Sequence, residues 1–336
     1  MKPVIGITMG DAAGVGPELI LKTLSDKEVY NECMPVVIGS YDWLNKLYIE
    51  LRRKNIVADL NLIMIDSCAK LKSKLNSNYP NILIYDDFKL DFENIKIGQV
   101  NKECGKASIL YLSKVVDLIG RGLVDGTCSA PVNKEAINLA GYHYNGQTEF
   151  FTEITGAARV VPLIIIDNIR MFQLTAHMPL KQVLSSLNSS QIFEIIVFAD
   201  ASLKKIGIRT PKISIAGINP HAGENGLLGT EEIEIFKPAI DQAKNKGINI
   251  NGPFPADSLF LRVKNGEFDC IITIYHDQAT IAMKLLGIPI TMTLGLPFIR
   301  TSVGQGTAYD IAGLYIADES VFKKSLIVCA ESIKKY

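Results

Sequence analysis

Histidine is scarce in this chain of 336 residues, which contains only four. A surplus of charge is also missing, because 35 Lys and Arg residues balance 35 Asp and Glu residues. This balance gives no support for nucleic acid or an anionic membrane as a partner, although a few local cations suffice to bind a small anionic substrate. The chain also lacks any run of about 18 apolar residues, so no membrane-spanning helix is expected.

Familiar short motifs are missing as well. The N-terminal MKPVIGITMGDAAG has no signal-peptide pattern, and no CxxC pair occurs. We therefore expect a soluble cytoplasmic protein whose cysteines are reduced and mostly buried. The six cysteines are Cys33, Cys68, Cys104, Cys128, Cys270 and Cys329. The first glycine-rich segment is neither a GxGxxG dinucleotide fingerprint nor a Walker loop, which would need a lysine.

Short apolar runs alternate with longer amphipathic segments, which predicts an α/β fold with a mostly parallel sheet. Several apolar runs are continuous, as expected for strands covered on both faces. The expected strands include Val4–Met9, Met34–Ile38, Asn61–Ile65, Ile82–Tyr85, Val161–Ile166, Ile213–Ala216, Ile271–Ile274 and Pro289–Thr293. The expected helices are Pro17–Leu24, Ala107–Arg121, Ser190–Ile206, Thr230–Lys246 and Glu319–Lys334. Pro238 should kink or split the fourth helix, and a domain boundary is expected near Gly126–Pro131.

Three of the four histidines lie in segments rich in turn-forming and acidic residues. His177 is in TAHMPL, His221 in NPHAGENGLLG and His276 in YHDQ. Neutral imidazole is the commonest side-chain ligand of catalytic divalent metals, and three protein ligands leave a position open for substrate. The separations are too long for a local metal motif, and a histidine taken alone in such a segment is more often an ordinary surface or loop residue.

The first expected strand is followed by a glycine-rich loop that contains Gly10, Asp11, Gly14 and Gly16. Glycine lets the backbone approach a ligand, and the N-terminus of the helix that follows offers N–H groups to an anion. Because a glycine-rich turn after a first strand is common, an ordinary turn is an equal alternative.

A second polar group follows the expected strand end near Cys128. Ser129, Asn133, Lys134 and Thr148 lie where open α/β sheets bind ligands. Turn and helix-cap chemistry accounts for these residues at least as well.

Further candidates lie in the second half of the chain. Asp277 follows a metal-candidate histidine and could orient it or bind the cation, and Lys284 is about two helical turns further on. Asp257 lies in a proline-rich turn. Arg300 is placed in a loop of small residues, where its guanidinium suits a bidentate contact with carboxylate or phosphate.

Eight ordered segments together carry a resemblance that none carries alone. They are GITMGDAAGVGPE, SAPVNKEAI, NGQTEFF, TAHMPL, INPHAGENGLLGTEE, GPFPADSLF, YHDQ and LGLPFIRTSV. The chain resembles the 4-hydroxythreonine-4-phosphate dehydrogenase family of pyridoxal phosphate biosynthesis over essentially its whole length. The resemblance implies an isocitrate/isopropylmalate dehydrogenase-like fold in which two α/β domains flank a cleft. The first domain is expected at 1–126 plus about 300–336, and the second, with the metal histidines and dimer contacts, at 127–299.

The resemblance also implies a site and a reaction. His177, His221 and His276 would bind one divalent cation (zinc, magnesium or cobalt) in a site shared between the subunits of a homodimer. Thr148, Lys284 and Arg300 would contact the substrate, and the first loop would lie near NAD or NADP. The implied reaction is the oxidation and decarboxylation of 4-phosphohydroxy-L-threonine to 3-amino-2-oxopropyl phosphate, with Lys284, or Asp277 through a water, as the base.

Two departures from the family pattern bear on the substrate. Gln147 stands where the family usually has a substrate-contacting histidine, and Thr291 stands where an asparagine is usual. An amide can hydrogen-bond but carries no charge or proton at neutral pH. A related phosphorylated hydroxy acid, such as 4-phospho-D-threonate or 4-phosphoerythronate, is therefore an alternative substrate, and a non-catalytic binding protein is an alternative of another class.

Overall fold

The computed structural model describes residues 2–88 and 94–336 and divides into two compact units. Unit 1 comprises Met1–Val160 and Ile290–Lys334, and unit 2 comprises Val161–Pro289 with Lys335–Tyr336. The sequence placed the boundary near Gly126–Pro131. The observed division differs because strand β5 (Gly126–Ser129) pairs with strands on both sides in the middle of the unit 1 sheet.

The sheet of unit 1 is parallel except for its last strand. β1 pairs with β2 and β5, β4 with β2 and β3, and β12 with β5, all in parallel, whereas β11 runs antiparallel to β12. In spatial order the strands are β3 (Asn61–Ile65), β4 (Asn81–Tyr85), β2 (Met34–Ile38), β1 (Val4–Thr8), β5, β12 (Ile299–Val303) and β11 (Ile290–Leu294).

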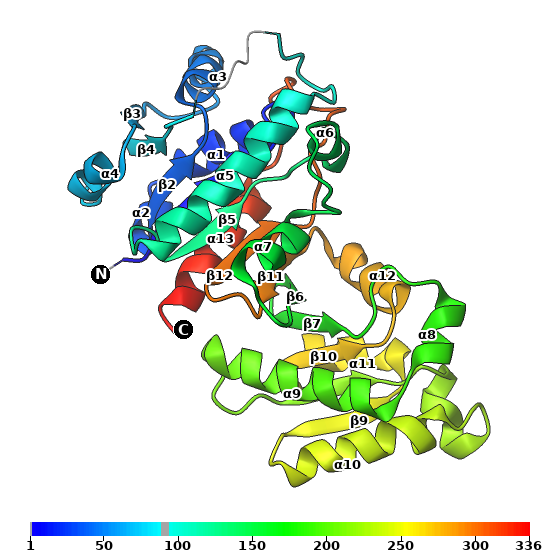
Figure 1. Cartoon of the computed structure of the whole chain (residues 1–336). Helices are drawn as coiled ribbons and strands as arrows, with labels where there is room; N and C mark the ends of the chain where they lie inside the picture. Colours follow the sequence, from blue (N-terminus) through cyan, green and yellow to red (C-terminus); the bar gives the residue numbers. More distant parts are fainter. Residues whose placement is uncertain (1, 89–93) are drawn as a thin grey trace. The chain divides into compact units, whose positions relative to one another are not determined.

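Helices cover both faces of this sheet (Figure 1). An added Cβ at Gly6 of β1 would meet Val115 of helix α5, and one at Gly126 would meet Ile333 of helix α13, so these helices pack on opposite faces. This burial on two faces explains the continuous apolar runs of β1 and β2. The helices of unit 1 are α1 (Gly16–Leu24), α2 (Val29–Glu32), α3 (Tyr41–Arg53), α4 (Cys68–Lys74), α5 (Lys102–Gly120), α6 (Lys134–Leu139), α7 (Gln147–Thr155) and α13 (Ser320–Ile333).

Unit 2 has a sheet of its own, in which an antiparallel hairpin is followed by parallel strands. The strand order is β6 (Val161–Ile166), β7 (Ile169–Gln173), β10 (Cys270–Thr273), β8 (Ile213–Ala216) and β9 (Ile250–Phe254). Its helices are α8 (Leu180–Ser186), α9 (Ser189–Lys205), α10 (Lys237–Asn245), α11 (Ala256–Lys264) and α12 (His276–Leu286), with short helical segments at Pro220–Gly226 and Glu232–Phe236. No helix within the described residues combines the length and the apolarity that crossing a membrane requires.

The predicted α/β class is confirmed, and each predicted strand and helix has a counterpart. The helix predicted at Thr230–Lys246 is split as expected, because a π-helical segment ends at Phe236 and Pro238 lies in the first turn of α10. The prediction of a loop around Arg300 was wrong, because this residue lies within strand β12. Three of the five residues in its sequence, IRTSV, are polar, which is typical of a loop, but both faces of the strand are buried.

Candidate active site

One face of the unit 1 sheet carries a row of polar side chains that runs across β1, β5, β12 and β11. In the strand register, Ser129 of β5 pairs with Thr8 of β1 on one side and with Ser302 of β12 on the other. Between β12 and β11, Ser302 pairs with Thr291 and Arg300 pairs with Thr293. Paired residues on neighbouring strands point to the same face. We call this row the polar strip; its residues are Thr8, Ser129, Thr291, Thr293, Arg300 and Ser302. The opposite face carries Cys128 and Thr301, which bond Ser325 of α13.

Arg300 is the charged member of the polar strip and is only 3% exposed. Its Nη1 donates to Thr293 Oγ1 (2.7 Å), its Nη2 donates to Gln147 Oε1 (3.1 Å), and its guanidinium lies 5.5 Å from the ring centre of Phe151. Burial lowers the pKa of Arg300 to about 10, so the side chain is charged at neutral pH. No carboxylate among the described residues pairs with it.

Three buried polar atoms of the strip have no hydrogen-bond partner among the described residues: Thr8 Oγ1, Ser129 Oγ and Arg300 Nε. A buried polar group left unsatisfied costs about 1–3 kcal/mol, and more when it is charged. A buried cation without a counter-charge is therefore expected to take an anion from outside the chain.

The residues predicted around the second polar group have different roles. Gln147 begins α7 and also donates through Nε2 to the carbonyl of Ala130 (3.0 Å). Thr148 follows it and is half-buried. Asn133 is a helix cap, since its Oδ1 accepts from the Ala136 N–H (2.8 Å), which supports the ordinary alternative for this residue. Lys134 begins α6 beside it.

The first loop is held by its own backbone and by neighbouring chain. Asp11 N–H donates to the Pro131 carbonyl, Gly14 N–H to the Asp11 carbonyl, and Val15 N–H to the Thr307 carbonyl. An added Cβ at Gly10 would lie 2.3 Å from the Pro131 oxygen, and one at Gly14 would lie 2.8 Å from the Thr307 oxygen. These glycines are required by close chain packing, and several of the loop's N–H groups are already used.

The Asp11 side chain fixes this loop from inside. Its Oδ1 accepts from the Ala13 N–H (2.8 Å) and its Oδ2 from the Tyr309 hydroxyl (2.9 Å). Burial raises the pKa of Asp11, and these hydrogen bonds only partly oppose that effect. Asp11 therefore joins the first loop to the segment after β12.

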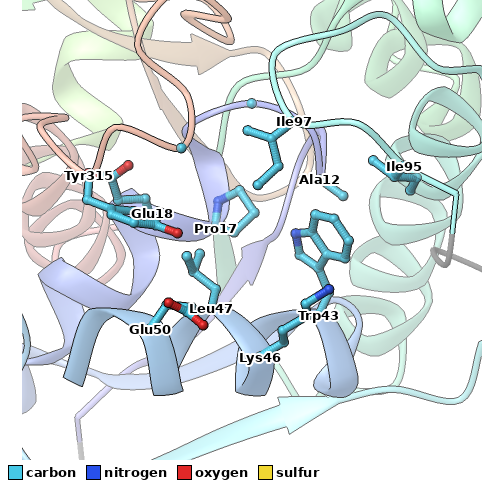
Figure 2. Close-up of a pocket in the computed structure, with 12 residues that line it drawn as sticks. Ala12, Pro17, Glu18, Trp43, Lys46, Leu47, Glu50, Ile95, Ile97 and Tyr315 are labelled. Carbon is cyan, nitrogen blue, oxygen red and sulfur yellow. The ribbon is translucent and has the colours of Figure 1, made fainter. Parts of the chain in front are cut away.

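A cavity of about 130 Å³ opens beside the first loop (Figure 2). Trp43 and Leu47 of α3 line it opposite Pro17 and Ile97. Sites that enclose a whole ligand usually measure about 300–1,000 Å³, so this cavity suits one ring of a larger molecule. Its remaining lining residues are Ala12, Gly14, Glu18, Lys46, Glu50, Ile95, Gly313 and Tyr315.

The three predicted metal histidines lie at one edge of the unit 2 sheet. His177 follows β7, His276 follows β10 and His221 follows β8. These strands are parallel neighbours, so the loops after them emerge at the same edge. The Gln278 side chain connects two of these loops by accepting from the Ile274 N–H (2.7 Å) and donating to the Gly217 carbonyl (2.7 Å). We call this the histidine edge.

Two of these imidazoles lie together, and two are oriented by carboxylates. The ring centres of His177 and His276 are 5.5 Å apart, and both residues line a hollow with Tyr275. His276 Nδ1 lies 2.7 Å from Asp277 Oδ1, and His221 Nδ1 lies 3.0 Å from Glu224 Oε2. Such contacts orient an imidazole so that Nε2 faces a metal.

His221 begins an unusual left-handed turn. Residues 221 to 225 all have positive φ, from 43° at Glu224 to 81° at Gly223. This conformation costs roughly 1–2 kcal/mol for each residue that has a Cβ. The buried Glu232 carboxylate supports the turn, since its Oε1 accepts from the N–H groups of Ile218 and Asn219 (both 2.8 Å).

The donors at the histidine edge fit a divalent cation chemically, because imidazoles with carboxylate-bonded Nδ1 atoms are typical ligands. Across 2–88 and 94–336, however, no three His, Cys, Asp or Glu side chains are already gathered closely enough to hold an ion. Lys284 is eight residues after His276 on α12, about 12 Å along the helix axis, and it is exposed.

Comparison with known proteins identifies the family. The sequence pattern of the family described as "Pyridoxal phosphate biosynthetic protein PdxA" matches residues 31–329. The chain belongs to the PdxA family. The 4-hydroxythreonine-4-phosphate dehydrogenase of Desulforapulum autotrophicum is 39% identical over 322 residues, which are 95% of this chain and 92% of that protein.

Other PdxA relatives carry a second name. The D-threonate 4-phosphate dehydrogenase of Salmonella typhimurium is 38% identical over 311 residues, 92% of each chain. The crystal structure of a 4-hydroxythreonine-4-phosphate dehydrogenase from Klebsiella pneumoniae superimposes with a TM-score of 0.86 at 35% identity, covering 99% of this chain and 98% of that one. The protein is therefore an oxidoreductase of the PdxA type, acting on phosphorylated hydroxy acids.

Sequence reasoning missed several residues that shape these PdxA sites. Thr293, Tyr309 and Glu232 hold Arg300, Asp11 and the His221 turn, respectively. Their partners are distant in sequence or lie across a sheet register, so no local pattern indicated them. Trp43 was detectable as the single tryptophan of the chain, but nothing nearby indicated a cavity.

Proposed function

We propose that this PdxA-family protein oxidises and then decarboxylates a four-carbon phosphorylated 3-hydroxy acid with a divalent cation and NAD or NADP. The observation that carries the proposal is Arg300, a buried guanidinium with no acidic partner among the described residues. An oxyanion of the substrate would supply the missing counter-charge of Arg300, because a guanidinium binds phosphate and carboxylate with paired hydrogen bonds.

Two substrates of this class differ only in the group at C2. D-Threonate 4-phosphate has a hydroxyl there, and 4-phosphohydroxy-L-threonine has an amino group. We favour D-threonate 4-phosphate, since Thr291 departs from the pattern of the threonine enzymes and a relative of that name is 38% identical. Its product would be dihydroxyacetone phosphate, whereas the threonine substrate would give 3-amino-2-oxopropyl phosphate.

The chemistry has two steps. The C3 hydroxyl loses its proton to a base, and hydride passes from C3 to the nicotinamide, which leaves a β-keto acid. The C1–C2 bond then breaks, CO2 leaves, and the electron pair is held as an enolate until C2 is protonated. Arg300 would fix the oxyanion of the substrate throughout, so that C3 keeps its orientation.

His177, His221 and His276 would hold the cation, with Asp277 orienting His276 through the 2.7 Å contact. A bound zinc, magnesium or cobalt ion would supply Lewis-acid polarisation of the hydroxyl and of the later enolate. We assign the base to Lys284, because helical side chains lean toward the N-terminus of their helix, and His276 is at that end of α12. The axial separation leaves room for substrate between them.

The cofactor is proposed to lie along the first loop, at Gly10, Asp11, Gly14 and Gly16, with one ring in the Trp43 cavity. A ring stacked on an aromatic side chain contributes about 1–3 kcal/mol. Trp43→Ala should therefore raise the KM for the dinucleotide by about tenfold or more while the KM for the acid stays constant. Equal KM values for the dinucleotide would remove the cavity from the cofactor site.

A homodimer is proposed with the histidine edge at the subunit interface. Unit 2 exposes large apolar side chains that a monomer would leave in water, including Leu285 at 82%, Leu227 at 78% and Ile281 at 60% exposure. Analytical ultracentrifugation should give twice the chain mass. A monomer with full activity would contradict a shared site.

The reaction is tested by a substrate panel. Purified protein, stripped with chelator and reloaded with each metal, is given either acid with NAD or NADP, and both nucleotide reduction and CO2 release are followed. Turnover of D-threonate 4-phosphate that requires metal is the expected result. Preference for 4-phosphohydroxy-L-threonine would reverse the substrate assignment. No turnover of any phosphorylated hydroxy acid by the metal-loaded protein would favour a binding protein instead.

A further inference from the structure

We propose that Gln147 is a positioning residue that holds Arg300 for the substrate and does not itself contact the substrate. This inference rests on the proposed function for its kinetic consequences, but the geometry behind it is independent of any substrate. Gln147 stands at the first position of α7, and its amide connects Ala130, the residue after β5, with Arg300 of β12.

The two ends of the Gln147 amide have complementary partners. Its oxygen accepts from Arg300 Nη2 at 3.1 Å, and its nitrogen donates to the Ala130 carbonyl at 3.0 Å. A guanidinium has only donors and a carbonyl has only acceptors, so the reverse orientation of the amide would break both contacts. The bridge therefore requires one acceptor and one donor on a single short side chain.

The bridge matters because Arg300 has few other restraints. Of its nitrogen atoms, Nη1 is held by Thr293, Nη2 by Gln147, and Nε has no partner among the described residues. Without Gln147, the Nη2 donor and the Ala130 carbonyl would each lose a partner. The guanidinium would then be restrained only by Thr293 and by packing over Phe151.

An imidazole at this position can form the same bridge only when it is neutral. One ring nitrogen would have to accept from Arg300 while the other donates, and protonation removes the acceptor and brings a second positive charge. The other charged groups around Gln147 are Lys134, whose Cε is 3.8 Å from the place of a Cβ on Gly146, and Glu149, whose carboxylate bonds the Asn145 N–H. Glutamine does not titrate, so it holds Arg300 in the same way at pH 6 and pH 8.

Kinetics on the full-length, metal-loaded enzyme provide the first test. Gln147→Leu keeps a similar size and removes both contacts. It should raise the KM for each phosphorylated acid by the same factor, about 10- to 100-fold, because a hydrogen bond to a charged group is lost. The KM for the dinucleotide should stay constant. If Gln147 touched the substrate at C2 directly, Gln147→Leu would instead change the preference between D-threonate 4-phosphate and 4-phosphohydroxy-L-threonine.

Rescue by histidine sharpens this test. Gln147→His should approach wild-type kcat/KM at pH 8 and fall about fourfold below it at pH 6, since about three quarters of an imidazole with an unperturbed pKa near 6.5 is protonated there. The readout is the kcat/KM of Gln147→His divided by that of wild type at each pH, because this ratio removes pH effects common to both proteins. A ratio that does not change with pH would contradict the bridge.

A stability cycle tests the bridge without any turnover. Thermal unfolding is compared for wild type, Gln147→Leu, Arg300→Met and the double variant, with Arg300→Lys as a second partner in case Arg300→Met does not fold. Gln147→Leu should lower the unfolding midpoint in the wild-type background and have a clearly smaller effect when Arg300 is absent. Gln242→Leu on the exposed face of α10 is the control for an added leucine.

The outcomes separate the two proposals. Equal effects of Gln147→Leu in both backgrounds would overturn the positioning role. Coupling in the stability cycle together with no turnover by the wild-type protein would support the bridge and count against the proposed reaction. Coupling with a matched rise in the KM for both acids would support both proposals.

Discussion

The polar strip of unit 1 and the histidine edge of unit 2 are built in opposite ways. Arg300 is 3% exposed and is fixed by Thr293 and Gln147. By contrast, the side chain of His221 is 67% exposed and that of His276 is 39% exposed. The strip has its side chains in place before any ligand binds, whereas the edge brings ligands to the same side of a sheet without closing them into a cluster.

This difference teaches that the two sites use different sources of binding energy. In the strip, folding has already met the cost of burying a cation, so an anion that enters gains a strong and oriented partner. At the edge, a cation would have to bring exposed side chains together and would compensate for that ordering by its coordination bonds. Variants of the edge histidines should thus affect function more than stability, whereas a variant of the strip that leaves Arg300 without a hydrogen-bond partner should change both.

The largest effect is expected at the histidine edge. His276→Ala should abolish tight metal binding and lower kcat by about a thousandfold or more, because Lewis-acid stabilisation amounts to several kcal/mol. The unfolding midpoint without metal should remain near that of wild type, since the side chain is 39% exposed. Bound metal is measured by mass spectrometry of the purified protein. The same experiment on His221→Ala should give the same loss, and full activity in either variant would refute the shared site.

His143→Ala is the matched control for this experiment, since His143 is the fourth histidine and is exposed in unit 1. It should keep its metal content. A loss of metal from this variant would mean that the metal ligands are not those of the histidine edge.

The second largest effect is expected in the strip. Arg300→Met should weaken binding of the phosphorylated acid by about 100-fold, because a buried charge pair with the substrate is lost. Stability should be unchanged or higher, because an apolar side chain of similar length replaces a buried and unpaired cation. Calorimetry gives the dissociation constant of the acid, and thermal unfolding of the same preparation gives the unfolding midpoint. Weaker binding together with strong destabilisation would show that Arg300 is mainly structural.

The sequence was informative about the strands that lie near these sites but not about how the sites are completed. The continuous apolar runs correctly predicted β1, β6, β8 and β10 because burial on both faces leaves a signal in the sequence itself. β12 gave no such signal, since its buried polar residues Arg300 and Thr301 find their side-chain partners on β11, α7 and α13.

The histidine edge shows the same limit. The loops after β7, β8 and β10 become neighbours through a spatial order, β7-β10-β8, that differs from the order along the chain. Only the family resemblance connected His177, His221 and His276 in advance. The left-handed turn was also hidden, because Ala222 and Glu224, two of its five residues, are of types that rarely adopt positive φ.

The third prediction concerns the buried acid of unit 1. Because burial raises the pKa of Asp11 above its ordinary value of 3.8, the folded state binds the proton more tightly than the unfolded state. The free energy of unfolding therefore falls as the pH rises above 3.8, and the loss persists at neutral pH. Asp11→Asn should remove this contribution, so its stability relative to wild type should improve with rising pH. Denaturant unfolding at a series of pH values measures the difference, and a constant difference would place the Asp11 pKa at its ordinary value.

The smallest expected effect tests whether the backbone of the left-handed turn at the histidine edge is strained. Ala222 has φ 54° and ψ 41° within the left-handed turn, so Ala222→Gly should raise the free energy of unfolding by about 1 kcal/mol, because glycine adopts this conformation without a Cβ clash. The matched control is Ala201→Gly, at a solvent-exposed position within α9. There the same substitution should lower the free energy of unfolding by about 0.5–1 kcal/mol. Effects of opposite sign, measured by denaturant unfolding, would show that the edge stores strain in its backbone. Destabilisation in both variants would mean that this turn is an ordinary loop, and the contrast with the polar strip would then rest on exposure alone.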